Sequence, residues 1–309
     1  MDVRSSLRRG HLHAMARAPR TKPLLVAIGN CQISAVSVLL KHSAPFRDSY
    51  RVAALPGVHE IPAADVPLLH SLVRRASVLL TQQVREDYRG LEVGTATLSN
   101  LLDSGARHLL MSTVYFRGDH PTTVYVHRAD GAAVRAPLTA EYHDLRFIAA
   151  AAASEDDAVA LRHLEHEVIE PEVLQRVRVE SEEELRRRDE KVDIPSADLL
   201  QEVVAKPGVW TPNHPTNAVV QGLASRIAVS LGLADLTQTT RPELLGEIRI
   251  PALGGPGSSK RRAWMIHGSP VDESEIFRQH LAFYRSRPDV LSLALSEHAS
   301  SLELMGLQA

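Results

Sequence analysis

The chain has 309 residues, enough for a substantial buried core, and a formal net charge of -2 at pH 7. So small a net charge gives no overall attraction to nucleic acid or to an anionic membrane surface. No apolar stretch approaches the roughly 18 residues that span a bilayer. A single cysteine permits no internal disulfide, which fits a reducing compartment. We therefore expect a cytoplasmic protein with no membrane span and no nucleic-acid partner.

The first 21 residues are rich in arginine but lack the apolar core of a secretory signal, which predicts a disordered basic extension over residues 1–21. Strands and helices then alternate. A continuous apolar run at residues 23–28 predicts a strand buried on both faces, followed by a helix over 33–41. The same alternation predicts strands over 50–55, 77–80 and 108–112, with helices over 64–75 and 95–102.

Repeated strand–helix units imply parallel crossovers. The predicted fold class is therefore α/β, with a doubly wound, mainly parallel sheet of flavodoxin type over roughly residues 22–125. An alanine run predicts a helix at 149–153, and it leads into a charged helical insert over about 150–195 in which Pro171 must break or kink the helix. A helical stripe in this insert includes Leu161, Leu164 and Val168. Further helices are predicted over 218–231 and 273–285, with a mobile basic loop at 252–262 between them.

The only cysteine, Cys31, follows the first predicted strand in the segment Gly29-Asn30-Cys31-Gln32. Ligands of open parallel sheets bind beyond the carboxyl ends of the strands. Gly29 permits the tight turn that exposes the sulfur, and a helix N-terminus supplies N–H groups that can lower a thiol's pKa and stabilise an oxyanion. Position alone leaves a nucleophile and a small buried hydrophobe equally open.

Other polar residues also follow predicted strands, so they would lie at the same carboxyl edge of the sheet as Cys31. Gln82 and Arg85 follow the third predicted strand, and Ser112 and Thr113 follow the fourth. They are candidates for an oxyanion donor, a phosphate clamp or a substrate-positioning group, although loops after strands are commonly polar without such a role. His214, in a polar turn before a predicted helix, is a candidate general base.

Two weaker patterns could indicate a metal site or a phosphate-binding loop. Four side chains at helical spacing could hold a metal, but the surrounding charge favours a solvated helix face, so no metal is expected; they are His163, His166, Glu167 and Glu170. The glycine-rich stretch 254–257 before three basic residues lacks the flanking strand and helix of a phosphate-binding loop, so a surface loop is expected.

The ordered motifs resemble the WcbI-type polysaccharide-biosynthesis family over roughly residues 22–235. They are Gly29-Asn30-Cys31-Gln32, Thr81-Gln82 with Arg85 and Tyr88, Tyr115-Phe116 with His120-Pro121, and Asn213-His214-Pro215-Thr216-Asn217. Members of this family look like distant relatives of the SGNH hydrolases, with cysteine in place of serine. The family's known member binds coenzyme A and is thought to acetylate a capsular sugar.

The resemblance implies Cys31 as nucleophile or acyl-positioning residue and His214 as general base. It also implies that Gln32, Gln82 and Arg85 line the pocket or bind the ligand, and Asn30 beside them is a further candidate for binding coenzyme A. Candidates for the oxyanion or substrate are Gly29, Tyr88, Ser112, Thr113 and Asn213. Coenzyme A or acetyl-CoA would be the co-substrate. SGNH enzymes place an aspartate three residues before the histidine, where this chain has Thr211. The acid partner of His214 must come from elsewhere, or the site is a Cys–His dyad.

Three functions follow from these features. The preferred one is coenzyme A-dependent acyl transfer to a sugar or glycan hydroxyl in polysaccharide biosynthesis, with a capsule as the family's example. The alternatives are an SGNH-like esterase or thioesterase, and a non-catalytic module that binds coenzyme A or a glycan. We expect a catalytic domain over residues 22–235 and a C-terminal loop and helical extension over 236–309 packed on it; the oligomeric state stays open.

Overall fold

The computed structural model describes residue 14 and residues 21–166, 168–201, 207–236, 242–253 and 263–307. Nearly all of the predicted basic extension, and most of the predicted loop at 252–262, lie outside these residues. The chain divides into two compact units, each formed by three segments. Unit 1 comprises Met1–Val114, Leu185–Val204 and Pro215–Leu245, and unit 2 comprises Tyr115–Glu184, Ala205–His214 and Gly246–Ala309. The predicted extent of a catalytic domain, residues 22–235, stays a prediction.

Unit 1 is built on a parallel four-stranded sheet with the order β2-β1-β3-β4. Its strands are β1 (Leu24–Ile28), β2 (Arg51–Ala54), β3 (Val78–Thr81) and β4 (Arg107–Leu110). With the first strand inside the sheet and a crossover to either side, this is the flavodoxin-like strand order. The predicted α/β fold with a doubly wound parallel sheet is confirmed.

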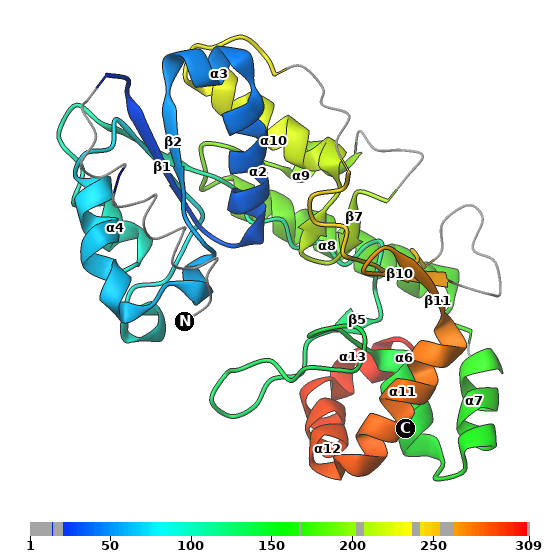
Figure 1. Ribbon diagram of the computed structural model, residues 1–309. Helices are drawn as coiled ribbons and strands as arrows, with labels where there is room; N and C mark the ends of the chain where they lie inside the picture. Colours follow the sequence, from blue (N-terminus) through cyan, green and yellow to red (C-terminus); the bar gives the residue numbers. More distant parts are fainter. Residues whose placement is uncertain are drawn as a thin grey trace. The chain divides into compact units, whose positions relative to one another are not determined.

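Helices cover both faces of this sheet, because side chains of a strand point alternately to its two sides. Leu24, Val26 and Ile28 pack into a core with α4 (Val66–Val73) and α5 (Thr95–Ser99). On the other face α2 (Cys31–His42) lies against β1 and β2, and α10 (Asn217–Ser230) packs on α2 (Figure 1). Two shorter helices complete the unit, α3 (Ala44–Ser49) and α9 (Ala197–Gln201). β1 is therefore buried along its whole length, as its unbroken apolar run predicts.

Unit 2 is mainly helical, with small antiparallel sheets. Its helices include α6 (Leu145–Ala153), α7 (Asp157–His166), α11 (Glu273–Ser286), α12 (Pro288–Glu297) and α13 (Ala299–Leu304). Its strands are β5 (Thr123–Val124), β6 (His143–Asp144), β7 (Val209–Thr211), β9 (Ile248–Arg249), β10 (Ala263–Ile266) and β11 (Ser269–Asp272). Two elements run from unit 2 into unit 1, namely α8 (Pro171–Asp189) and β8 (His214–Pro215). A buried aromatic cluster of Phe147, Trp264 and Phe277 ties α6 to α11 and β10.

Several predicted elements differ at their ends. Pro171 does break the helical run, and it begins α8 because proline suits the first turn of a helix. The predicted stripe ending at Val168 is wrong, since α7 ends at His166 and Val168 is 76% exposed. Helices α12 and α13 follow α11. No helix was predicted at α12, and α13 lies after Ser296, where the sequence pattern is weak. None of the helices in the described ranges is long and apolar enough to cross a membrane.

Candidate functional site

Cys31 is the first residue of α2 and is half-buried at the carboxyl end of β1. The helix begins two residues earlier than predicted because Asn30 caps it: the Asn30 Oδ1 accepts the N–H of Gln32 at 2.9 Å. The predicted position of Cys31 between strand and helix is thus confirmed. Its chemical role stays a prediction.

Two buried glutamines fix the turn that carries Cys31. Gln82 Oε1 accepts the N–H of Asn30 at 2.9 Å, and Gln82 Nε2 donates to Gln32 Oε1 at 3.0 Å and to the Ser112 carbonyl at 3.3 Å. Gln32 Oε1 accepts the N–H of Val114 at 3.0 Å, and Gln32 Nε2 donates to the Val114 carbonyl at 2.7 Å. These bonds join the segments that follow β1, β3 and β4. Gln32 and Gln82 therefore order this edge of the sheet, and ligand binding by them stays a prediction.

Gly29 is required here for close approach rather than for an unusual backbone angle. A Cβ atom at this position would lie 2.6 Å from Gln82 Oε1 and 2.6 Å from Ile33 Cγ1. The Gly29 carbonyl also accepts the N–H of Val58 at 2.7 Å. The glutamine can therefore reach the backbone of Asn30 only because Gly29 has no side chain.

The electrostatics of Cys31 differ from the expectation. Burial raises the pKa of the Cys31 thiol and outweighs the N–H groups of Cys31 and Gln32, which act to lower it, while the Glu60 carboxylate adds to the rise. The expected lowering by the helix N-terminus is therefore wrong in its net direction. Cys31 is therefore protonated at neutral pH, and nucleophilic attack by its sulfur needs a base to take the thiol proton.

Two predicted substrate groups after β4 are engaged with the protein. The buried Ser112 hydroxyl accepts a hydrogen bond from Ser196 Oγ at 2.8 Å, and the Thr113 carbonyl accepts one from Arg188 at 3.3 Å. These contacts tie the end of β4 to the last turn of α8 and to the segment that follows it. Substrate contact by Ser112 and Thr113 stays a prediction.

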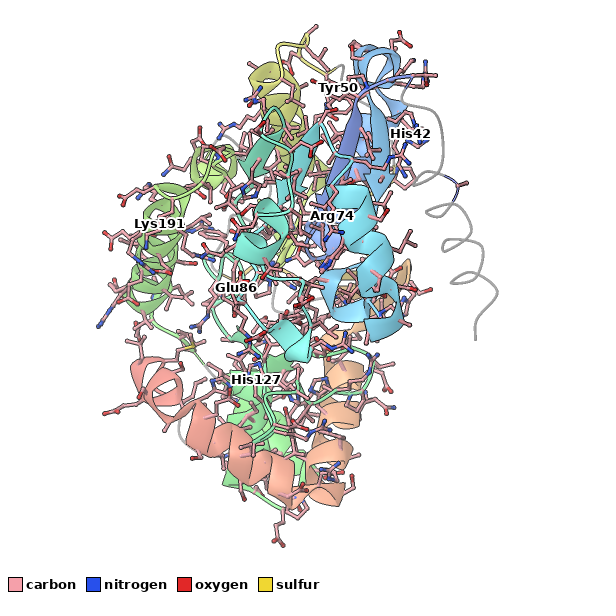
Figure 2. The ribbon with its side chains drawn as sticks, turned by 90° about the vertical axis from the view of Figure 1, so that its left-hand side faces the viewer. His42, Tyr50, Arg74, Glu86, His127 and Lys191 are labelled. Carbon is pink, nitrogen blue, oxygen red and sulfur yellow. The ribbon has the colours of Figure 1, made fainter. Side chains whose placement is uncertain are left out.

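Arg85 lies on the loop after β3 and is exposed. The central carbon of its guanidinium lies over the Tyr88 ring, 5.8 Å from the ring centroid. It makes no hydrogen bond or ion pair with any residue that the structure describes. The next residue, Glu86, anchors the loop, since its carboxylate accepts the N–H groups of Ala96 and Thr97 at 2.9 and 3.2 Å at the start of α5 (Figure 2). Arg85 is therefore a cation available to an anionic ligand. The role of Glu86 was missed, because an acid nine residues before a helix matches no capping pattern.

His214 lies in unit 2, whereas Cys31 lies in unit 1. Burial lowers the pKa of His214 to about 4, so its imidazole is neutral at pH 7. Its Nδ1 lies 3.5 Å from the Tyr142 hydroxyl, and none of the described carboxylates bonds to it. Thr211, in the place where the resemblance expects an acid, donates to the Tyr142 hydroxyl at 2.9 Å, and Asn213 accepts from that hydroxyl at 2.6 Å. Tyr142, 72 residues away in the chain, was missed by the sequence analysis.

Two other places, a possible metal site and a cavity, are poorer candidates for the functional site than the carboxyl edge of the sheet. Among the described residues, no three His, Cys, Asp or Glu side chains lie where they could share a metal ion; Glu167 of the predicted alternative lies outside them. A cavity of about 420 Å³ in unit 1 is lined by residues that include Lys22, Arg51 and Ser77. It lies at the amino ends of the strands, opposite the edge where ligands of such sheets bind.

Comparison with known proteins gives one family and one solved structure. Residues 24–236 match the sequence model of the polysaccharide biosynthesis enzyme WcbI. The chain is also similar in fold to a solved structure of WcbI, described as a novel polysaccharide biosynthesis enzyme in its native form without a disulfide bond between coenzyme A and a cysteine. That similarity has a TM-score of 0.76 at 18% identity and covers 92% of this chain and 99% of the other. No curated protein sequence matches the chain significantly.

Proposed function

Because the chain belongs to the WcbI family of polysaccharide biosynthesis enzymes, we propose that it transfers an acyl group, acetyl above all, from coenzyme A to a sugar hydroxyl in the cytoplasm. The observation that carries this proposal is the Cys31 thiol at the first turn of α2, on a turn fixed by two buried glutamines. The related structure is described in terms of coenzyme A and a cysteine together, and Cys31 is the only cysteine of this chain.

Arg85 supports coenzyme A as the ligand. Its exposed guanidinium has no anionic partner among the described residues, and it follows β3 at the carboxyl edge of the sheet. A guanidinium binds phosphate through paired N–H groups, and coenzyme A carries phosphates at its nucleotide end. The thiol end of the ligand would then lie toward the turn that holds Cys31.

Cys31 and His214 are the proposed catalytic groups. In direct transfer, the sugar oxygen attacks the thioester carbonyl carbon while its proton passes to His214; the carbon–sulfur bond then breaks, and coenzyme A leaves as a thiol with that proton. In transfer through the enzyme, His214 takes the Cys31 proton, the sulfur attacks the thioester carbonyl carbon, and the carbon–sulfur bond to coenzyme A breaks, so that coenzyme A leaves as a thiol with that proton. The sugar oxygen then attacks the Cys31 thioester while its proton passes to His214, and the bond to Cys31 breaks as the sulfur takes that proton back. Because burial raises the pKa of Cys31, the second route needs His214 to take the thiol proton before the sulfur attacks.

Turnover of acetyl-CoA with sugar acceptors tests the proposal, using the variants Cys31→Ser, Cys31→Ala and His214→Gln. Loss of the base is expected to lower kcat by roughly 10²–10⁴-fold. Full activity in both Cys31 variants would remove this residue from the chemistry, and full activity in His214→Gln would remove the base. Release of free coenzyme A without a sugar product would instead identify a thioesterase, and p-nitrophenyl acetate with and without acceptor separates ester hydrolysis from transfer.

A non-catalytic binding module is the second candidate, and a specific observation favours it. His214 has no carboxylate partner among the described residues, and burial holds Cys31 as a thiol. Such a module would bind coenzyme A without turning over its acyl esters. Isothermal titration with coenzyme A beside the turnover assay separates the two, because only the enzyme combines binding with acyl transfer.

A further inference from the structure

The loop after β2 brings a carboxylate to the same edge of the sheet as Cys31. It contains a short 3₁₀ helix, η1 (Val58–Glu60), whose first residue donates its N–H to the Gly29 carbonyl at 2.7 Å. Gly29 lies two residues before Cys31, so this bond joins η1 to the turn that carries the thiol. Burial raises the pKa of Cys31, and the Glu60 carboxylate raises it further. Glu60 therefore lies close enough to act on the sulfur, and both residues belong to unit 1.

The Glu60 side chain is held in place but is not paired with a cation. Its Oε2 accepts the N–H of Gly57 at 3.1 Å, which fixes the carboxylate on its own turn. Arg89, on the loop after β3, donates from Nη1 to the carbonyls on either side of Glu60, those of His59 and Ile61, at 2.5 and 3.4 Å. Within the described ranges, no cation forms an ion pair with Glu60 and no donor bonds to its Oε1.

The loop that supplies Arg89 has an unusual backbone. Asp87 and Arg89 have φ angles of 54° and 59°, in the left-handed region that favours glycine. Such conformations persist only where the surrounding structure holds them, and they cluster at functional sites. Here Glu86 joins the loop to the start of α5, and Arg89 joins it to η1. Two neighbouring loops of the carboxyl edge therefore fix the position of Glu60.

Opposite charges lie on these two loops. The exposed guanidinium of Arg85 suits the phosphates of coenzyme A, whereas the carboxylate of Glu60 repels them. Glu60 therefore suits the other end of the reaction, where the acyl group meets its acceptor. A carboxylate oxygen accepts a hydroxyl hydrogen in a charge-assisted bond, which is stronger than a bond between neutral groups. A sugar presents several such hydroxyls.

We infer that Glu60 binds a hydroxyl of the acceptor through Oε1, and that its charge selects a neutral sugar over an anionic one such as a uronic acid. The binding of an acceptor rests on the proposed function, whereas a negative charge near the Cys31 sulfur is a property of the free protein. Glu60 is a binding residue in this scheme, and the transferred proton still passes to His214.

The charge is tested on the full chain without substrate, by alkylating Cys31, the only cysteine, with neutral iodoacetamide and anionic iodoacetate. The ratio of the two rates cancels any change in the pKa of Cys31, because the same thiolate attacks both reagents. Glu60→Gln should raise the iodoacetate rate relative to the iodoacetamide rate by roughly fivefold at low salt, since a like charge is removed. Glutamine keeps an oxygen for the Gly57 N–H, so the turn is retained.

Glu92→Gln is the matched control. It removes another exposed carboxylate from the loop after β3, one that does not contribute to the pKa of Cys31, and it should leave the ratio of rates unchanged. An unchanged ratio in Glu60→Gln, or an equal change in both variants, overturns the inference.

Acetyl transfer supplies the second measurement. With acetyl-CoA as donor, the acceptor probes are methyl glucoside and methyl glucuronide, which differ in a hydroxymethyl group or a carboxylate at one carbon. The wild type should have the higher kcat/KM for the glucoside. Glu60→Gln should raise the KM for the glucoside roughly 10-fold, reduce the preference between the two sugars and leave the KM for acetyl-CoA unchanged.

The two measurements separate this inference from the proposed function. The same sugar preference and the same KM for the glucoside in wild type and Glu60→Gln would overturn the role of Glu60 in acceptor binding. A change in the alkylation ratio, in a protein that transfers acetyl to neither sugar, would keep the charge near Cys31 and count against acyl transfer instead.

Discussion

Replacing Gly29 with alanine tests whether the glutamine network positions Cys31. The new Cβ would lie 2.6 Å from both Gln82 Oε1 and Ile33 Cγ1, far inside contact distance, so both side chains must shift. Moving Gln82 breaks its bond to the Asn30 N–H, at a cost of about 1–3 kcal/mol for the buried donor left unpaired. Overpacking against Ile33 adds about 1–3 kcal/mol. We therefore expect Gly29→Ala to lower the free energy of unfolding by about 2–6 kcal/mol.

Gly105→Ala is the matched control, since nothing lies within 4 Å of a Cβ there and its backbone angle is ordinary. It should be neutral or slightly stabilising, by less than about 1 kcal/mol. Urea unfolding followed by far-ultraviolet circular dichroism measures both variants. Tryptophan fluorescence would not report this region, because Trp210 and Trp264 both lie in unit 2. A Gly29→Ala protein within about 0.5 kcal/mol of wild type would refute the close-approach argument.

Three further predictions can be measured directly. Arg85→Ala should weaken coenzyme A binding by roughly 10-fold in isothermal titration, as loss of one charge-assisted bond predicts, while Arg74→Ala, an exposed arginine at the end of α4 (Figure 2), should leave it unchanged. Alkylation of Cys31 by iodoacetamide should still accelerate above pH 9, because burial raises its pKa; a plateau below pH 8 would contradict this. Burial lowers the pKa of His143 to about 4 and of His280 to about 3, from 6.5, so these residues favour unfolding as the pH falls below 6.5. The urea midpoint of unfolding, followed by tryptophan fluorescence, should drop as the pH falls from 6.5 to 4. A midpoint that does not change over this range would contradict the burial of both histidines in their neutral form.

The sheet of unit 1 was predictable because each of its strands is a short apolar run bounded by turn residues. β1 is the clearest case: all five residues are buried, and the glycine and asparagine that follow mark its end. The position of Cys31 at the carboxyl end of β1 follows from the same pattern. Helix α13 gave no comparable signal, since Leu302 is its only buried residue.

The candidate site was less predictable, because its physics depends on contacts distant in sequence. The rise in the pKa of Cys31 comes from burial, which a strand-to-helix pattern does not measure. Gln82 was expected to meet a ligand, yet its contacts tie the turn to Asn30, 52 residues earlier. The Tyr142 contact with His214 spans 72 residues, and no local spacing rule connects the two. The turn that carries Cys31 was predictable from the sequence. The burial and the Glu60 carboxylate that raise the pKa of the thiol were not.

The chain passes between the two units five times, at Val114, Glu184, Val204, His214 and Leu245. Neither unit is therefore a continuous piece of sequence. A C-terminal truncation after Val114, Glu184, Val204 or His214 removes residues of both units, and one after Leu245 removes the last segment of unit 2. Exchanging one unit for that of a relative would therefore require all five junctions to be made at once.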